Sequence, residues 1–332
     1  MPLFPSKNEC RVEIVKFSDD LKDDWENVSD NSDQAWLYHR FDWHRIFKES
    51  WNPETFSFLV ALNGKIIGIF PMQRHMGNPI LFDSQAMGTG GLAVLNGLDG
   101  FHKSNISSAV YNHLASLIGN MCQAVRIFLP PCVAHFGNAM GIYGSYEDIS
   151  TQTYVIDLAK TEDEIFASFS KKSRWCVRKA LREFDFDIYH ASSQVDIDDY
   201  YRLHVETYTR TGANPHPKEY FDGIWKYFGT RNLCNFFMAK LDGEVIAADN
   251  VAIYKNWALY WTGASSGKAQ STNVNRVLQW EAIKWAKAQG CAFYESGEGF
   301  PDADENSKLG GLTKFKRSFG GKLIPFKKVL IR

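Results

Sequence analysis

The chain has 332 residues, of which 45% are hydrophobic and 23% are charged, and its formal net charge is -1 at pH 7. This balance is typical of a globular protein and excludes a globally disordered chain. The near-neutral charge excludes a protein that binds DNA through its overall field, although it allows a local basic face. A single hydrophobic core seldom grows beyond about 250–300 residues, so we expect two domains.

The spacing of the cysteines indicates whether a metal site is present, and the first residues indicate where in the cell the protein is found. The six cysteines lie far apart and form no pair with the spacing of zinc ligands, so the sequence predicts no metal site. The opening residues, MPLFPSKNEC, lack the basic start and apolar core of a secretory signal. No apolar run approaches the ~20 residues that span a bilayer. We therefore expect a cytoplasmic protein without a transmembrane segment.

Two β-hairpins are predicted at corresponding places in the two halves of the chain. Residues 56–72 form β-rich runs joined by Asn63-Gly64, and residues 235–250 form two more joined by Asp242-Gly243. These dipeptides tolerate the positive φ angles of a tight hairpin turn. Each hairpin precedes a glycine-bearing loop, an amphipathic helix and a strand. These lie at 87–91, 103–121 and 124–129 in the first half, and at 262–267, 272–289 and 291–295 in the second.

The repeated order predicts a mixed α/β (α+β) protein made of two similar domains, each a central mixed sheet flanked by helices. Helical sequence also precedes each hairpin, at 34–51 and at 197–227, and the second stretch is broken at 212–217. Glycines and polar residues near 137–151 mark the boundary. We therefore expect domains at 1–150 and 151–332.

A basic segment opens the second domain. Residues 169–182 contain six basic residues and no acidic one. In a helix, Arg174, Arg178 and Arg182 would share one face, and a row of guanidinium groups suits phosphate. Arg174 and Arg178 are therefore candidates for binding a donor phosphate or nucleic acid. The alternative is a solvated helix face balanced by the acidic residues at 162–164.

The carboxyl-terminal segment, residues 306–332, contains eight basic residues and no acidic one. Phe315 and Phe319 are four residues apart and can anchor one helical face in the core, which would position Lys316 beside them. A lysine held in this way can stabilise the oxyanion of an acyl-transfer intermediate. We take Phe315 and Arg317 as neighbouring donor-binding candidates. The alternative is a surface lysine next to a core ring.

Acyl transfer to an amine also requires a proton acceptor. No Ser/His/Asp constellation is present, which favours direct attack without a covalent enzyme intermediate. Glu295 and Glu298 end a predicted strand, and Asp249 lies in a strand among apolar neighbours, so each is a candidate base or a structural acid. Tyr260 and Trp261 can line a substrate groove, or belong to the core. The glycine loops match neither GxGxxG nor a Walker loop, so we expect no tightly bound nucleotide cofactor.

These features together resemble the FemAB-like and related proteins that pair two acetyltransferase-like (GNAT) domains. The motifs that carry the resemblance are Ser173-Arg174 with Arg178-Lys179-Ala180, Gly212 with Pro217, Leu278-Gln279-Trp280, and Leu312 with Phe315-Lys316 and Phe319-Gly320-Gly321. The resemblance implies a fold of tandem GNAT-like domains. It also implies transfer of an acyl or aminoacyl group, in well-known members from aminoacyl-tRNA to a peptidoglycan precursor, and it places Phe315 and Lys316 near the donor.

The resemblance and the basic segments together leave two hypotheses for function. The first is an acyltransferase that uses acyl-CoA or aminoacyl-tRNA as co-substrate and a small-molecule or peptide amine as acceptor. Its catalytic candidates are Lys316, Glu298 and Asp249. The second is a non-catalytic module that binds RNA or an anionic polymer. In both, the second domain carries the candidate residues, and either a monomer or a homodimer fits the sequence.

Overall fold

The structure is a computed structural model and describes residues 11–84, 88–132 and 144–332. Three predicted features lie wholly or partly outside the described residues: Cys10, the start of the loop at 87–91, and residues 137–143 of the boundary at 137–151. The chain divides into two compact units: Met1–Thr151 with Pro325–Arg332, and Gln152–Ile324. None of the helices in these ranges is long and apolar enough to cross a membrane.

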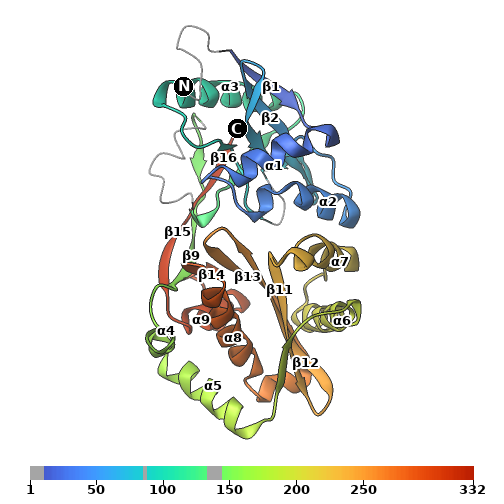
Figure 1. The fold of residues 1–332 in the computed structure, drawn as a ribbon, viewed down its shortest axis with the longest axis vertical. Helices are drawn as coiled ribbons and strands as arrows, with labels where there is room; N and C mark the ends of the chain where they lie inside the picture. Colours follow the sequence, from blue (N-terminus) through green and yellow to red (C-terminus); the bar gives the residue numbers. More distant parts are fainter. Residues whose placement is uncertain (1–10, 85–87, 133–143) are drawn as a thin grey trace. The chain divides into compact units, whose positions relative to one another are not determined.

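The first unit contains two sheets among its described residues (Figure 1). Their strand orders are β1-β2-β3-β6 and β4-β5-β7-β16-β8. The strands are β1 (Val12–Lys16), β2 (Phe58–Leu62), β3 (Lys65–Phe70), β4 (Gln73–His75), β5 (Asn78–Asp83), β6 (Ala93–Val94), β7 (Ala124–Phe128), β8 (Glu147–Asp148) and β16 (Lys328–Ile331). The helices are α1 (Lys22–Asp30), α2 (Phe41–Ser50) and α3 (Gly100–Leu117), with short 3-10 turns at Asp19–Leu21 and Leu37–His39.

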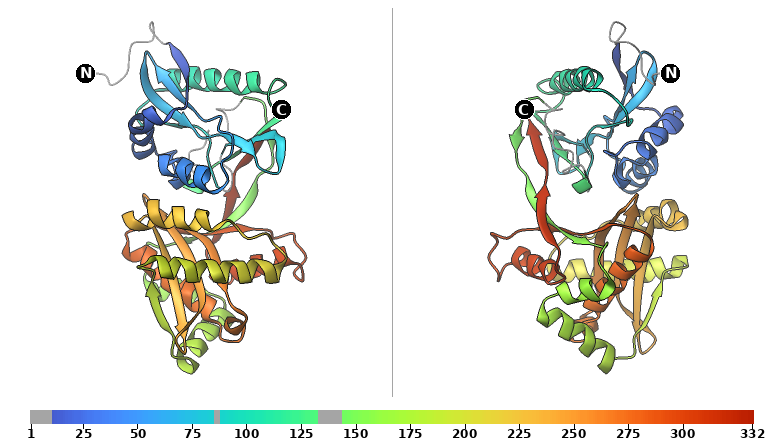
Figure 2. Two further views of the ribbon diagram at one scale, coloured as in Figure 1. Left: turned by 90° about the vertical axis from the view of Figure 1, so that its right-hand side faces the viewer. Right: turned by 60° about the vertical axis from the view of Figure 1, so that its left-hand side comes forward.

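The second unit is built on one sheet of strand order β10-β11-β12-β13-β14-β9-β15. The strands are β9 (Thr151–Asp157), β10 (Asp187–His190), β11 (Cys234–Leu241), β12 (Glu244–Tyr254), β13 (Trp257–Ser265), β14 (Phe293–Gly299) and β15 (Lys322–Phe326). The helices are α4 (Glu162–Ser168), α5 (Lys171–Glu183), α6 (Gln194–Thr211), α7 (Lys218–Tyr227), α8 (Val274–Ala288) and α9 (Lys308–Arg317), and 3-10 turns lie at Gly229–Arg231 and Gly267–Ser271. Figure 2 shows α6 and α7 across one face of the strands and α8 across the other.

The predicted repeat is present, and the mixed α/β fold class is confirmed. The hairpins β2–β3 and β11–β12 turn at Asn63-Gly64 and Asp242-Gly243, and all four residues have positive φ angles between 51° and 79°. In each unit a helix then connects two parallel strands: α3 lies between β5 and β7, and α8 between β13 and β14. Gly212, at the predicted break in the helical stretch, ends α6 with a left-handed φ of 70°.

The end of the chain differs from the sequence prediction. Residues 325–332 were assigned to the second domain, but β16 is an inner strand of the first unit, between β7 and β8. Conversely, β9 is an inner strand of the second unit while β8, just before it, is an edge strand of the first. Strand β16 belongs to the first unit because its buried side chains alternate: Val329 and Ile331 pack in the core of that unit.

Truncating the Ile331 side chain tests the assignment of β16 to the first unit. Ile331 is 1% exposed and pairs with Val125 of β7, so Ile331→Ala should destabilise the first unit by about 2–5 kcal/mol. Native-state hydrogen exchange should show faster exchange of amides in β7 and unchanged exchange in β11–β13. Leu323→Ala in β15, where the side chain is 38% exposed, is the matched control and should have little effect. Equal acceleration in both units would contradict the assignment.

Candidate functional site

Two parallel strands of the second unit separate at one point. β13 and β14 pair from Trp257–Phe293 to Leu259–Glu295. Beyond this point β13 continues to Ser265 beside β12, and β14 continues to Gly299 beside β9. In the described part of the chain, the facing edges of the two strands therefore share no strand pairing after Glu295. Such edges offer backbone donors and acceptors to an extended ligand.

Helix α9 brings Lys316 to the diverging end of β14. Its ammonium donates a hydrogen bond to the carbonyl oxygen of Glu298 at 3.0 Å. Burial lowers the pKa of Lys316 to about 8, with the carboxylates of Glu295 and Glu298 opposing that shift. Gly297 permits this approach, because its φ is +92° and an added Cβ would lie 2.7 Å from the Lys316 Nζ. The lysine is therefore positioned, partly desolvated and mostly protonated at neutral pH.

Glu295 is a second ionisable group at the same point. Its side chain is 5% exposed and accepts a hydrogen bond from the Thr153 hydroxyl at 2.8 Å. Burial raises the pKa of Glu295 to about 7, while the Thr153 bond and the charge of Lys316 oppose the shift. A carboxyl with a pKa near neutrality can exchange a proton under physiological conditions.

Asp249 is buried at 2% exposure in β12, next to a bulge against β13. Gln279 of α8 donates to its Oδ2 at 2.8 Å, and the Tyr260 hydroxyl donates to Oδ1 at 3.5 Å. Tyr294 in turn donates to Gln279 Oε1 at 3.2 Å. Burial raises the pKa of Asp249 to about 7, and the hydrogen bonds from Gln279 and Tyr260 oppose this shift.

A glycine in β13 makes room for the contact of Asp249 with Tyr260. A Cβ added to Gly263 would lie 2.1 Å from the Tyr260 hydroxyl and 2.6 Å from Asp249 Oδ1. Neither side chain could keep its place beside a larger residue. Trp261, the next predicted substrate residue, stacks on Phe228 with ring centroids 6.2 Å apart.

The predicted donor residues on α9 have different surroundings. Phe315 packs edge-to-face on Phe319 with ring centroids 4.9 Å apart, as the spacing predicted. Arg276 lies over both rings, and its Nη1 donates to the hydroxyls of Ser173 and Ser318, each at 2.7 Å. Arg317 points to solvent at 60% side-chain exposure, 4.0 Å from Glu305.

The predicted basic helix exists as α5, but its arginines do not form one row. Arg174 turns inward and donates to the carbonyl oxygens of Ala167, at 2.6 Å, and Phe169 at the end of α4. These are backbone acceptors that a helix end leaves without partners. Arg178 is exposed and lies over the Phe166 ring, 5.2 Å from its centroid. Neither guanidinium contacts Lys316 or Asp249 in the described part of the chain, so their binding role stays a prediction.

Two residues of this site had no predicted role in it. Gln279 and Arg276 lie on α8, whose other buried residues are mainly apolar. A glutamine within an apolar helical stripe signals a buried polar partner, and this pattern could have drawn attention to Gln279. Arg276 gave no such signal, because an arginine near the start of a helix is ordinary on a surface.

The corresponding point of the first unit is filled differently. The last parallel pair of β5 and β7 is Asp83 with Arg126, so Arg126 occupies the position that Glu295 has in the second unit. Arg126 donates to Asp83 at 2.8 Å, and His75 contacts the same carboxylate at 2.6 Å. These groups neutralise one another, which is a structural use of charge.

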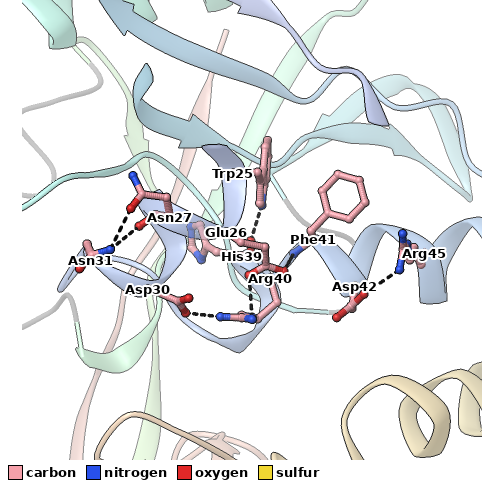
Figure 3. A network of polar contacts seen from close by, with 10 residues as sticks. All are labelled: Trp25, Glu26, Asn27, Asp30, Asn31, His39, Arg40, Phe41, Asp42 and Arg45. Carbon is pink, nitrogen blue, oxygen red and sulfur yellow. Dashed lines mark hydrogen bonds and ion pairs between the residues drawn. The ribbon is translucent and has the colours of Figure 1, made fainter. Parts of the chain in front are cut away.

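The first unit also uses partly buried charges to join its helices α1 and α2 (Figure 3). Glu26 pairs with Arg40 at 2.8 Å and accepts a hydrogen bond from the Phe41 amide at 3.0 Å. Arg40 also pairs with Asp30. Burial raises the pKa of Glu26, with Arg40 and the Phe41 amide opposing the shift. The contacts fix the entry to α2.

Comparison with known families and structures identifies this arrangement. Residues 167–316 match the family model described as an acetyltransferase (GNAT) domain. The match covers most of the second unit, which we therefore call the GNAT domain. The matched range includes the diverging strands and ends at Lys316. The match supports the prediction that the chain is an acyltransferase. No curated protein sequence matches the chain.

Solved structures extend the likeness over the whole length. The crystal structure of FemX is 16% identical, covers 96% of each chain and has a TM-score of 0.68. The C-terminal domain of a putative lysylphosphatidylglycerol synthetase from Agrobacterium fabrum is 11% identical over 94% of this chain and 91% of that one, with a TM-score of 0.59. A tandem GNAT protein from clavulanic acid biosynthesis is 11% identical over 97% and 98%, with a TM-score of 0.55. At these identities the likeness concerns the fold, and it confirms the predicted tandem architecture.

The buried carboxyl of Asp249 leads to a prediction about stability. Because its pKa is raised on folding, its contribution is present at low pH and is lost as pH rises from about 4 to about 7. Asp249→Asn cannot ionise. The free energy of unfolding of this variant, relative to the parent, should therefore increase by roughly 2 kcal/mol between about pH 5 and pH 8.5.

Urea unfolding of both proteins at the two pH values measures this change. Taking the difference between the two pH values cancels any loss of hydrogen bonding to Gln279 that does not depend on pH. A difference that stays constant between the two pH values would show that Asp249 does not titrate in this range.

Proposed function

We propose that the chain transfers an acyl or aminoacyl group from an activated donor to an amine by direct attack, where β13 and β14 separate in the GNAT domain. The observation that carries this proposal is the position of Lys316, a partly desolvated ammonium beside the diverging strands. The ammonium donates to the backbone carbonyl of Glu298 at 3.0 Å, and the carboxylates of Glu295 and Glu298 raise its pKa. No covalent enzyme intermediate is required.

The donor would lie in an extended form between the facing edges of β13 and β14. Backbone groups that share no strand pairing there can bind an extended arm. Tyr260 and Trp261 belong to this part of β13 and would lie beside the donor. The donor carbonyl oxygen would point to Lys316, whose charge stabilises the developing oxyanion. Phe315 and the Arg276 guanidinium over its ring hold α9 in register for this contact.

Attack forms a bond between the amine nitrogen and the carbonyl carbon and breaks the bond from that carbon to the leaving sulfur or oxygen. The amine proton passes to a carboxylate, and Lys316 can supply a proton to the leaving group. We favour Asp249 as the acceptor, through the Tyr260 hydroxyl at 3.5 Å, because its pKa near 7 suits a base at neutral pH. Glu298, farther along β14, is the alternative. The pH profile of kcat/KM in two variants separates these candidates. The acidic limb should disappear in Asp249→Asn if Asp249 is the base, and in Glu298→Gln if Glu298 is the base.

We take the candidate donors and acceptor from the family resemblance. Acyl-CoA and aminoacyl-tRNA are the two donor classes, and the amine of a cell-envelope precursor is the proposed acceptor. A screen with acetyl-CoA, longer acyl-CoAs, aminoacyl-tRNA and UDP-sugar peptides, read by thermal shift and by turnover, selects between them. A donor that both stabilises the protein and reacts supports the proposal. Salt-dependent retention of RNA with no turnover of any donor would favour a binding module instead.

The role of Lys316 gives a kinetic prediction. With the donor found in that screen, Lys316→Ala should lower kcat/KM by about 10²–10³-fold, the usual loss for one oxyanion donor. The alkaline limb of the parent pH profile should lie near the lysine pKa of about 8. Lys316→Arg should move that limb to higher pH, because a guanidinium stays charged.

Lys314 supplies the matched control. It lies on the same helix at 64% side-chain exposure and 3.8 Å from Glu305, so Lys314→Ala should retain nearly full activity. A folded Lys316→Ala protein with full activity, or an alkaline limb that Lys316→Arg leaves unchanged, would remove Lys316 from the mechanism.

A further inference from the structure

Helix α5 has an outer face that the proposed reaction does not use. Its inner face contains Ser173, Cys176, Val177 and Ala180, which are buried. Val177 and Ala180 pack with Val277 of α8 in one apolar cluster. On the outer face two large apolar side chains remain exposed, Trp175 at 55% and Leu181 at 52%. Large apolar groups on a solvent-facing helix are a usual mark of an interaction surface.

Basic side chains surround these two residues. Trp175, Arg178 and Leu181 are three residues apart and so follow one slanted row along the helix. The other basic residues of the outer face are Lys171, Lys172, Lys179 and Arg182. The ammonium of Lys179 lies over the Trp175 ring, 5.0 Å from its centroid. The apolar and basic groups therefore form one continuous surface, which we call the α5 face.

Few charges within the protein balance the α5 face. Lys179 and Arg182 share the carboxylate of Glu183, at 3.6 and 3.1 Å. Lys171, Lys172 and Arg178 form no ion pair with any residue that the structure describes. The face therefore keeps a positive charge that an anionic partner would neutralise.

We propose that the α5 face binds an anionic membrane surface. Aromatic and aliphatic side chains that protrude among lysines and arginines match the two layers of such a surface, because the rings enter the acyl boundary while the cations meet the headgroups. The exposed Leu181 favours a membrane over RNA, since an aliphatic side chain gains little from phosphates or stacked bases. The proposal does not depend on the proposed acyl transfer, and it would bring the enzyme to acceptors held at a membrane.

Cosedimentation of the full-length protein with vesicles tests the proposal. Vesicles of phosphatidylglycerol and phosphatidylcholine should bind the protein, and vesicles of phosphatidylcholine alone should bind it at least ten-fold more weakly. Lys171→Gln with Lys172→Gln should weaken binding by about 25-fold, from roughly five-fold per charge near such a surface. Trp175→Ala with Leu181→Ala should weaken it at least ten-fold on the anionic vesicles.

Matched controls change the same residue types elsewhere. Val195 is 69% exposed on α6, and Lys65 and Lys103 are exposed in the first unit. Val195→Ala, and Lys65→Gln with Lys103→Gln, should bind vesicles as the parent does. Circular dichroism and thermal unfolding confirm that each variant is folded.

Three results would overturn the proposal. The first is no vesicle binding by the folded parent protein. The second is equal binding to anionic and neutral vesicles, or unchanged binding by the α5 variants. The third is retention of RNA, lost in the α5 variants, without any binding to vesicles, which would assign the face to nucleic acid instead.

Discussion

The partly desolvated ammonium of Lys316, held where β13 and β14 separate, is the interaction on which the site depends. Burial lowers the pKa of this lysine, while the nearby carboxylates of Glu295 and Glu298 raise it. This balance keeps the lysine charged at neutral pH but close to its pKa. A positioned cation of this kind can stabilise an oxyanion and then give up a proton, which are the two tasks that acyl transfer sets.

The surrounding structure serves this lysine in separable ways. Gly297 leaves space for the ammonium, and packing of Phe315 on Phe319 fixes the face of α9 that carries it. Arg276 joins that helix to α5 through two hydroxyls. In the first unit the same strand position holds Arg126, which is paired with Asp83. The two units therefore share a similar scaffold, and among the described residues the charge arrangement that we propose for transfer lies in the second.

Sequence patterns predicted the parts of the fold that depend on local chemistry. The turns at Asn63-Gly64 and Asp242-Gly243, the repeated helix between parallel strands and the spacing of Phe315 and Phe319 follow from neighbours along the chain. The site depended on contacts between distant segments, so it was predicted only in part. The inward turn of Arg174, the Gln279 bond to Asp249 and the return of residues 325–332 to the first unit arise from tertiary packing, which no local spacing encodes.

The central claim is that the donor lies between β13 and β14 of the GNAT domain. Hydrogen exchange of the full-length protein, with and without a saturating donor that the protein turns over, tests it most directly. The account predicts slower exchange of backbone amides in residues 260–265 and 296–299 and no change in β5 and β7. Protection confined to β5 and β7, or none in residues 260–265 and 296–299 at saturating donor, would contradict it.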